Sequence, residues 1–152
     1  MFSIGKINRR HENKLGRFFK DVKDNIFFHP HLFTTKEAEK IANYKGRDIY
    51  YVIEDSTTII AYGFLRGWDD HEVDLCLGVV VKPSEQGKGY GELMCNILST
   101  IARQYKVDRV RLHVNPDNTT ALNLYKKLGY TFELKRENGD LIGFKDLRST
   151  NR

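Results

Sequence analysis

Three glycines at alternate positions, Gly87, Gly89 and Gly91, form the stretch of this sequence whose chemistry is easiest to infer. Glycine adopts positive φ angles without strain and lets a ligand come close to the main chain. The segment that follows is amphipathic, and the first amides of a helix have no intrahelical acceptor, so they favour an anion. Lys88 adds a positive charge within the loop. These residues therefore predict a cradle for a phosphate or a pyrophosphate.

The spacing of the glycines excludes the two common nucleotide-binding loops. A Walker A loop needs a Ser or Thr directly after its Gly-Lys pair, and here Gly89 follows Lys88. The dinucleotide fingerprint needs Gly-x-Gly-x-x-Gly, whereas these glycines are two positions apart throughout. A turn that only reverses the chain is the alternative, and the loop by itself does not decide against it.

The elements around the loop indicate where a ligand would enter. A long apolar strand is expected from Glu72 to Lys82, where Pro83 ends it. The segment 92–105 carries one apolar stripe at helical spacing, and the segment 108–114 alternates as a strand does. A strand-helix-strand connection makes its two strands parallel. We therefore expect the ligand at the parallel pair.

The rest of the chain is typical of helices and antiparallel strands. Further helices are expected at 13–22, 34–44 and 119–128, and further strands at 2–7, 48–54, 57–65, 130–134 and 141–147. Thr34 and Glu37 fit a capping box, and Asn138-Gly139 fits a hairpin turn. The predicted fold class is α+β, with a single mixed, mostly antiparallel sheet flanked by helices. One domain is expected over residues 1–152, with 148–152 as a frayed tail.

Composition limits the class of protein. A chain of 152 residues with 40% hydrophobic and 30% charged residues has a globular composition. No apolar run is long enough to span a membrane and no signal-peptide core is present, so we expect a cytoplasmic protein without a membrane partner. The net charge of +5 comes from Lys and Arg interleaved with Asp and Glu, which argues against a nucleic-acid partner. Cys76 and Cys95 lack metal-ligand spacing, and we expect no metal.

A second pattern lies one helix and one strand after the glycine loop. It reads Asn118-x-x-Ala121-x-x-Leu124-Tyr125-Lys126-Lys127-x-Gly129-Tyr130. Together with Val81-x-Pro83 and Gln86-x-x-Gly89-x-Gly91, it resembles the GCN5-related N-acetyltransferase (GNAT) family, which binds acetyl-coenzyme A. Two matches in the right order are more specific than either alone, although they cover only about the second half of the chain. The resemblance implies the acyl-CoA N-acyltransferase fold, with acetyl-CoA as cosubstrate.

The resemblance also implies roles for individual residues. Backbone groups of Val79, Val80 and Val81 would bind the pantetheine arm as an added strand does, and a strand amide would polarise the thioester carbonyl. The amides that would hold the pyrophosphate belong to Gln86, Gly87, Lys88, Gly89, Tyr90 and Gly91. Asn118 would bind the pantetheine arm or orient the site. Tyr125 would lie near the sulfur of the cofactor.

Acyl transfer requires such groups whatever the family. An amine attacks the thioester carbonyl, and a main-chain N–H aimed at the carbonyl oxygen stabilises the charge that develops there. The leaving thiolate belongs to a thiol with a pKa of about 8.5, and a nearby hydroxyl that supplies a proton helps it to leave. Tyr125 could be this catalytic acid. The alternative is that its ring only fills the core.

The sequence leaves two alternatives for the base that deprotonates the acceptor ammonium. Glu72 and Asp74 are expected to share one face of the central strand, and either carboxylate could act there. His113 lies five residues before Asn118, where some members of the family carry an acidic base, so this sequence departs from that pattern. A histidine with a pKa near 6.5 is nevertheless suited to the task.

The predicted function is acetyl transfer to a primary amine by direct attack in a ternary complex, because no Gly-x-Ser-x-Gly or Cys–His arrangement is present. Aromatic residues that could line the acceptor pocket are Phe27, Phe28, Phe33, Tyr50, Tyr51, Tyr62 and Trp68. With the turn Trp68-Asp69-Asp70, they favour a small molecule such as an amino sugar over a protein N-terminus or lysine. The alternative functions are a non-catalytic CoA-binding module and a nucleic-acid-binding domain. The sequence also allows a homodimer.

Overall fold

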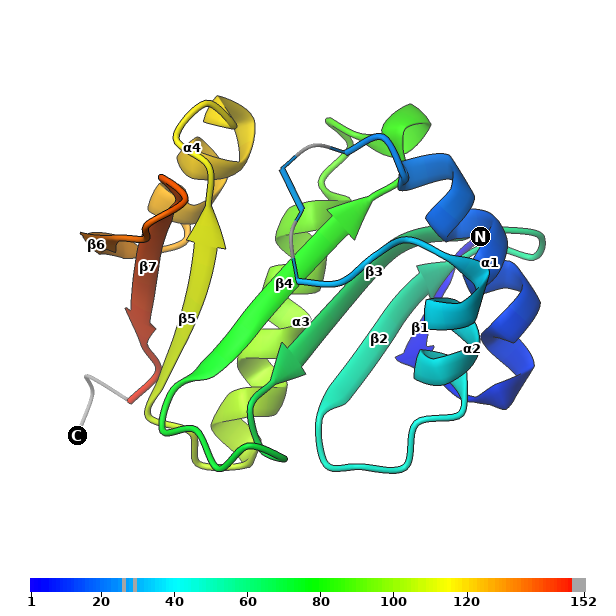
Figure 1. Ribbon diagram of the computed structural model, residues 1–152, viewed down its shortest axis with the longest axis horizontal. Helices are drawn as coiled ribbons and strands as arrows, with labels where there is room; N and C mark the ends of the chain where they lie inside the picture. The colour runs from blue at the N-terminus through cyan, green and yellow to red at the C-terminus, as the bar shows by residue number, and fades with distance from the viewer. Residues whose placement is uncertain (26, 29, 149–152) are drawn as a thin grey trace.

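The expected fold class is confirmed in the computed structural model, which describes residues 1–25, 27–28 and 30–148 (Figure 1). Seven strands form one mixed sheet in the order β1-β2-β3-β4-β5-β7-β6. All neighbouring strands are antiparallel except β4 and β5, which are parallel as the strand-helix-strand connection predicts. Most of the expected tail, residues 149–152, lies outside the described residues.

The expected helices and strands are all present, with boundaries shifted by a few residues. The strands are β1 (Ser3–Lys6), β2 (Ile49–Glu54), β3 (Ile59–Arg66), β4 (Leu75–Val81), β5 (Arg109–Val114), β6 (Thr131–Lys135) and β7 (Leu141–Asp146). The helices are α1 (Glu12–Val22), α2 (Thr35–Ala42), α3 (Tyr90–Gln104) and α4 (Thr119–Lys127). The Thr34 side chain accepts from the Glu37 amide at 3.1 Å, which is one half of the expected capping box.

One boundary was predicted wrongly, and it concerns the site. Glu72 and Asp74 do not belong to the central strand, because β4 begins only at Leu75. Residues 72–74 belong instead to the turn that enters β4, and the Glu72 amide donates to the Gly67 carbonyl at 2.9 Å. Buried Asp48 fixes the start of this turn, since its carboxylate accepts from the amides of residues 67 and 68 at 2.9 and 3.0 Å. The strand alternation that was expected to align the two carboxylates is therefore absent.

Helices cover both faces of the sheet (Figure 1). On one face, α3 packs over β3 and β4 with Met94, Leu98 and Ala102 fully buried, and partly buried side chains of α4 pack against the same core. On the other face, α1 and α2 pack over β2 and β3 and bury aromatic rings that include Tyr62 and Phe64. The sheet is thus held between two apolar cores. In the described part of the chain, no helix is both long enough and apolar enough to cross a bilayer.

The parallel pair separates soon after it begins. β4 pairs with β5 only at Leu75↔Val110 and Cys76↔Arg111. The other edge of β4 pairs with β3 as far as Val81, and β5 pairs with β7 over six positions. Beyond the two shared pairs, β4 and β5 therefore diverge, as Figure 1 shows, and each stays fixed by its outer neighbour. The divergence opens the sheet at the carboxyl ends of both strands.

A buried ion cluster joins the first helix to the edge of the sheet. Glu54 in β2 is only 4% exposed, and its Oε2 lies 2.8 Å from His11 Nε2 while its Oε1 accepts from Lys14 Nζ at 2.8 Å. Burial favours the neutral carboxyl, but the hydrogen bonds from Lys14 and His11 outweigh it and lower the pKa of Glu54 to about 2. The ionised carboxylate therefore stabilises the folded state.

Replacing Glu54 by Gln should lower the free energy of unfolding at pH 7 by about 2–3 kcal/mol, because Lys14 and His11 lose the buried carboxylate to which they donate. Since the folded-state pKa is depressed, the wild-type advantage is present above pH 4.5 and is lost as the pH falls toward 2. Urea titrations of both proteins at several pH values measure this. As a control, Asp146→Asn changes an exposed carboxylate that pairs with Arg148 at the surface, and it should leave the free energy of unfolding nearly unchanged. Equal stability of Glu54→Gln and wild type at pH 7 would contradict this account.

Candidate active site

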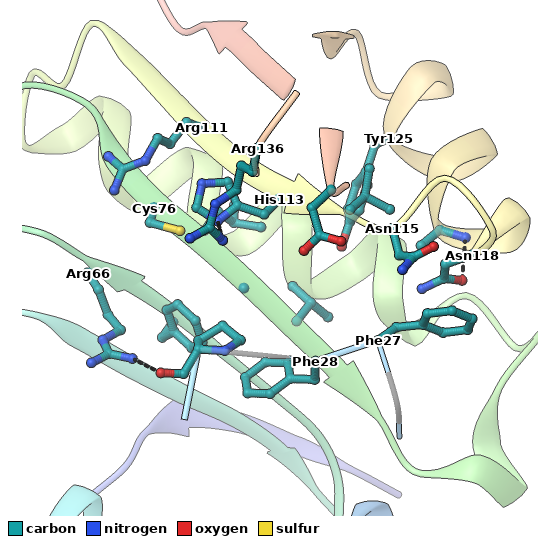
Figure 2. A pocket seen from close by; sticks show the side chains of 18 of the residues that line it. Phe27, Phe28, Arg66, Cys76, Arg111, His113, Asn115, Asn118, Tyr125 and Arg136 are labelled. Atoms are coloured by element: carbon teal, nitrogen blue, oxygen red, sulfur yellow. Dashed lines mark hydrogen bonds between the residues drawn. The ribbon is translucent and has the colours of Figure 1, made fainter. Parts of the chain in front are cut away.

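A cavity of about 440 Å³ lies where β4 and β5 diverge. Its walls come from β3, β4, β5, the start of α4, the hairpin between β6 and β7, and the aromatic segment before α2 (Figure 2). Segments far apart in the sequence therefore meet at one point. The size suits a small molecule or the reactive end of a larger one.

Tyr125 of α4 lines this cavity. It lies on the apolar side of the helix and packs edge-on against Tyr130, with 5.7 Å between the ring centroids. Burial in these apolar surroundings raises its pKa well above 10, and Cys95 adds to the effect. The phenol therefore keeps its proton at neutral pH and can donate it. Ala121 and Asn118, one and two turns earlier, line the same cavity.

The glycine loop leads from the end of β4 into α3. Gly87 and Gly89 have φ angles of +79° and +90°, and an added Cβ would meet nothing within 4 Å at either position. Glycine is therefore needed there for its backbone angle and not for space. Gly91 is the second residue of α3 and has no positive φ. Because the amides that open α3 have no intrahelical acceptor, they are available to an anion.

Two side chains of the loop, those of Gln86 and Lys88, bind neighbouring groups of the protein. Gln86 Nε2 donates to the Val81 carbonyl at 3.3 Å, which holds the loop against the end of β4. Lys88 Nζ pairs with Glu85 at 2.9 Å on the surface. The positive charge that the sequence places in the loop is thus partly compensated. The main-chain amides are left as the principal donors of the loop.

The three valines that end β4 have different environments. Val79 lines the cavity, whereas the Val80 side chain is buried on the face covered by α1 and α2. The Val81 side chain packs on the other face, against the core under α3. On the edge toward β5, the ladder includes no residue of β4 beyond Cys76. Apart from the Val81 carbonyl, which accepts from Gln86 Nε2, the backbone groups of residues 77–81 on that edge belong to no ladder in the described part of the chain and can pair with an extended ligand.

Asn118 begins α4, where its side-chain oxygen accepts from the Ala121 amide at 3.4 Å. It is an N-cap, and it also lines the cavity beside Asn115 (Figure 2). The same residue therefore fixes the start of the helix that carries Tyr125 and presents an amide to the cavity.

Glu72 lines the cavity but has a partner within the protein. Its Oε2 accepts from the Arg111 guanidinium at 2.8 Å, and Arg111 also donates to the Asp74 carbonyl. The Asp74 carboxylate pairs with Arg109 at 2.6 Å and does not line the cavity. Of the two carboxylates considered from the sequence, only Glu72 reaches the site.

His113 lines the cavity from β5, and its Nδ1 lies 3.1 Å from an Arg136 guanidinium nitrogen. Desolvation, followed by the charges of Arg136 and Arg111, lowers its pKa below 6.5. The imidazole is therefore neutral at pH 7. Because Arg can only donate, Nδ1 must be the acceptor, so that Nε2 carries the proton. In this arrangement His113 has no lone pair left for a substrate ammonium.

Several residues of the cavity were not identified from the sequence. Phe64 and Arg66 reach it from β3, and Arg136 and Asp140 reach it from the last hairpin. Asn138-Gly139 indicated a turn, but nothing in the sequence indicated that this turn would face α4. Of the expected aromatic lining, the cavity includes Phe27 and Phe28 and leaves out Phe33, Tyr50, Tyr51, Tyr62 and Trp68.

The turn expected to recognise an amino sugar points elsewhere. Trp68 packs against Tyr105, with 5.5 Å between the ring centroids, and Asp69 accepts from the Tyr44 hydroxyl and the Arg47 amide. Only Asp70 of this turn lines the cavity. The positions of Trp68 and Asp69 therefore do not support the prediction of an amino-sugar acceptor.

A mixed sheet that opens between two parallel strands, with a glycine loop leading from the first strand into a helix, defines an acyl-CoA N-acyltransferase fold. The model of the "Acetyltransferase (GNAT) family" matches residues 18–130, and the chain belongs to this family. The resemblance found in the sequence is thereby confirmed. Membership identifies the chain as an acetyltransferase and leaves its acceptor undefined.

Individual relatives differ in how much of the chain they match. A mycothiol acetyltransferase from Tsukamurella paurometabola is 40% identical over 53 residues, which cover 35% of this chain and only 18% of that protein. A GNAT-family acetyltransferase from Streptococcus pneumoniae superposes with a TM-score of 0.82 at 18% identity, covering 96% of this chain and 99% of its own. The structure of yncA from Salmonella typhimurium with its cofactor acetyl-CoA gives 0.81 at 16% identity, covering 100% and 97%. At these identities, the structures establish the fold alone.

The titration of His113 tests the electrostatics of the cavity. In nuclear magnetic resonance titrations, its pKa should lie below 6.5, and Arg136→Gln should raise it, because a cation that disfavours the imidazolium is removed. Arg148→Gln, which removes an arginine at the far end of β7, should leave the His113 pKa unchanged. A wild-type pKa above 6.5 would show that the imidazole is not held between these arginines.

Proposed function

We propose that this chain transfers the acetyl group of acetyl-CoA to the primary amine of a small molecule, by direct attack within a ternary complex and in one domain over residues 1–152. The observation that carries the proposal is the free edge of β4, which runs from the glycine loop to the cavity that Tyr125 lines. One extended molecule with a pyrophosphate at one end and a thioester at the other fits that path.

The cofactor would be held mainly by main-chain groups. The amides of residues 86–91 would bind the pyrophosphate at the start of α3, where the helix dipole also favours an anion. The free edge at Val79, Val80 and Val81 would pair with the pantetheine arm as a neighbouring strand does. Asn118 would donate its side-chain amide to the same arm. Binding of this kind depends on backbone geometry, which Gly87 and Gly89 provide.

The reaction needs one proton acceptor and one proton donor. The amine nitrogen attacks the thioester carbon, its excess proton passes to a base, and the carbon–sulfur bond breaks. Tyr125 then gives its phenolic proton to the departing thiolate, and exchange with water restores both groups. Glu72 and His113 remain candidates for the base, but each is already bound to an arginine in the cavity wall.

Gly89→Ala should weaken the binding of coenzyme A about tenfold. The loop of the variant relaxes away from its positive φ, and binding has to restore an angle that costs a non-glycine residue about 1–2 kcal/mol. Gly5→Ala is the matched control, because Gly5 lies in the edge strand β1 with open space around its Cβ position. Isothermal titration calorimetry measures both. Undetectable binding of coenzyme A by the wild type would overturn the proposed function.

Tyr125→Phe should lower the turnover number by about 100-fold or more, as loss of a general acid does, while the affinity for coenzyme A is retained. Thiol release from acetyl-CoA in the presence of a panel of primary amines measures turnover. Tyr130→Phe removes a neighbouring hydroxyl and keeps the ring contact, so it should leave turnover unchanged. A non-catalytic CoA-binding module would bind coenzyme A and release no thiol with any amine.

A further inference from the structure

Asp140 is a buried carboxylate in the wall of the cavity. It precedes β7 in the hairpin after β6, is 2% exposed and lines the cavity with Tyr125 and His113. Its Oδ2 accepts from Asn138 Nδ2 at 3.3 Å, and its amide donates to Asn138 Oδ1 at 3.0 Å. Within the described part of the chain, Oδ1 has no hydrogen-bond partner. A buried carboxylate oxygen without a donor costs free energy, so this position calls for a cation.

The nearest arginine along the chain does not supply that cation. The Arg136 amide donates to the Asp140 carbonyl at 2.7 Å, but its guanidinium donates to the neutral ring of His113. Among the residues described, no carboxylate lies within ion-pair distance of Arg136. An anion and a cation thus adjoin in one hairpin without neutralising each other.

A second arginine of the cavity has the same property. Arg66 lies over the Phe64 ring, with its guanidinium carbon 5.4 Å from the centroid, and donates to the Pro30 carbonyl at 3.5 Å. It too forms no ion pair with a described carboxylate. Figure 2 shows Arg66, Arg111 and Arg136 toward one end of the cavity and Tyr125 toward the other. Arg111 is the arginine already neutralised, by Glu72.

We propose that the acceptor is a small amine with an anionic group close to the amine, held between Asp140 and the two arginines. The ammonium binds the free oxygen of Asp140, and the anionic group, a carboxylate or a phosphate, binds Arg136 and Arg66. Guanidinium groups recognise such planar or tetrahedral anions through paired hydrogen bonds. The inference rests on the proposed acetyl transfer, since it assigns the second substrate of the same site.

A diamine is the competing acceptor, because Asp70 also lines the cavity and could hold a second ammonium. Asp70 is exposed at the turn after β3, so its charge is screened by water and salt. Asp140 is buried, and Arg66 is partly buried against an aromatic ring. Arg136 is exposed, as Asp70 is, so the comparison depends on Asp140 and Arg66. These two groups of opposite sign are the less screened pair, which favours a zwitterion over a dication.

Asp140 then has a second task in the reaction. The bound ammonium loses one proton to the carboxylate, and the neutral nitrogen then attacks the thioester carbon. The carbon–sulfur bond breaks and the thiolate takes the phenolic proton of Tyr125. The second proton that the nitrogen sheds on becoming an amide passes through water and restores the phenol. Asp140 suits this task better than the two earlier candidates, because the Glu72 carboxylate is neutralised by Arg111 and His113 Nδ1 accepts from Arg136. It is the base that the sequence left unassigned.

Matched acceptors test the inference on the wild-type protein. Phenylalanine, leucine and methionine are each compared with the corresponding amide, the decarboxylated amine and the α-aminophosphonate, with thiol release as the readout. We expect kcat/KM for the carboxylate or the phosphonate to be at least tenfold higher than for the amide and the decarboxylated amine, which lack the anionic group. Whichever of the carboxylate and the phosphonate has the higher kcat/KM identifies the preferred anion. A preference for neutral amines, diamines or amino sugars over all of these overturns the inference.

Variants test the two groups separately. Arg66→Gln and Arg136→Gln should each reduce the preference for the anionic acceptor about tenfold, mainly through KM, and leave the neutral amine little changed. Asp140→Asn should lower kcat for every acceptor about 100-fold, and more than Glu72→Gln or His113→Gln does. Asp146→Asn, at the far end of β7, is the control that should retain activity. If Asp140→Asn keeps wild-type kcat, the role of Asp140 is wrong.

Failure of the inference and failure of the proposed function give different results. Calorimetry with coenzyme A and thiol release with any amine measure the proposed function without reference to Asp140. Coenzyme A binding together with turnover of neutral amines only would overturn the inference and retain the acetyltransferase activity. Absence of thiol release with every amine would overturn both. Urea titration of each variant shows whether it is folded before its activity is compared.

Discussion

The whole site depends on the point at which β4 and β5 stop pairing. Each strand pairs with another strand on its outer side: β4 pairs with β3 as far as Val81, and β5 pairs with β7 along its whole length. Neither can turn toward the other without breaking its own ladder, so the opening between them is fixed by the rest of the sheet. A buried or half-buried strand edge needs partners for its backbone groups. A linear ligand that can hydrogen-bond to a strand is the natural complement.

A different helix lies at each end of this opening. The glycine loop brings the first turn of α3 to the end of β4, while the Asn118 cap directs α4 so that Tyr125 faces the cavity. The helices pack on the same face of the sheet and share one apolar core. Core packing and the proposed site geometry are therefore coupled, because a shift of either helix would change the distance between the amides that open α3 and the Tyr125 phenol.

The sequence was most informative where function depends on consecutive residues. The glycine loop and the Asn118–Tyr130 pattern are local, and both could be recognised without knowing the fold. Glu72 was assigned to the strand because apolar residues continue toward it, but the Asp48 carboxylate holds the preceding turn outside the ladder. Arg66, Arg136 and Asp140 could not be predicted as a group. They are separated by up to about seventy positions, and only the order β4-β5-β7-β6 brings the last hairpin to the cavity.

The separation of Tyr125 from the arginines of the cavity has a chemical consequence for the proposed proton transfer. Desolvation raises the pKa of Tyr125, which alone would make it a weaker acid. The same surroundings disfavour the thiolate, so the pKa of the leaving thiol rises together with that of the phenol. Proton transfer depends on the difference between these two pKa values. An arginine beside Tyr125 would stabilise the thiolate and remove its need for a proton. With the arginines toward the opposite end, the proposed proton transfer from Tyr125 stays useful, and their charge is available to the proposed anionic acceptor.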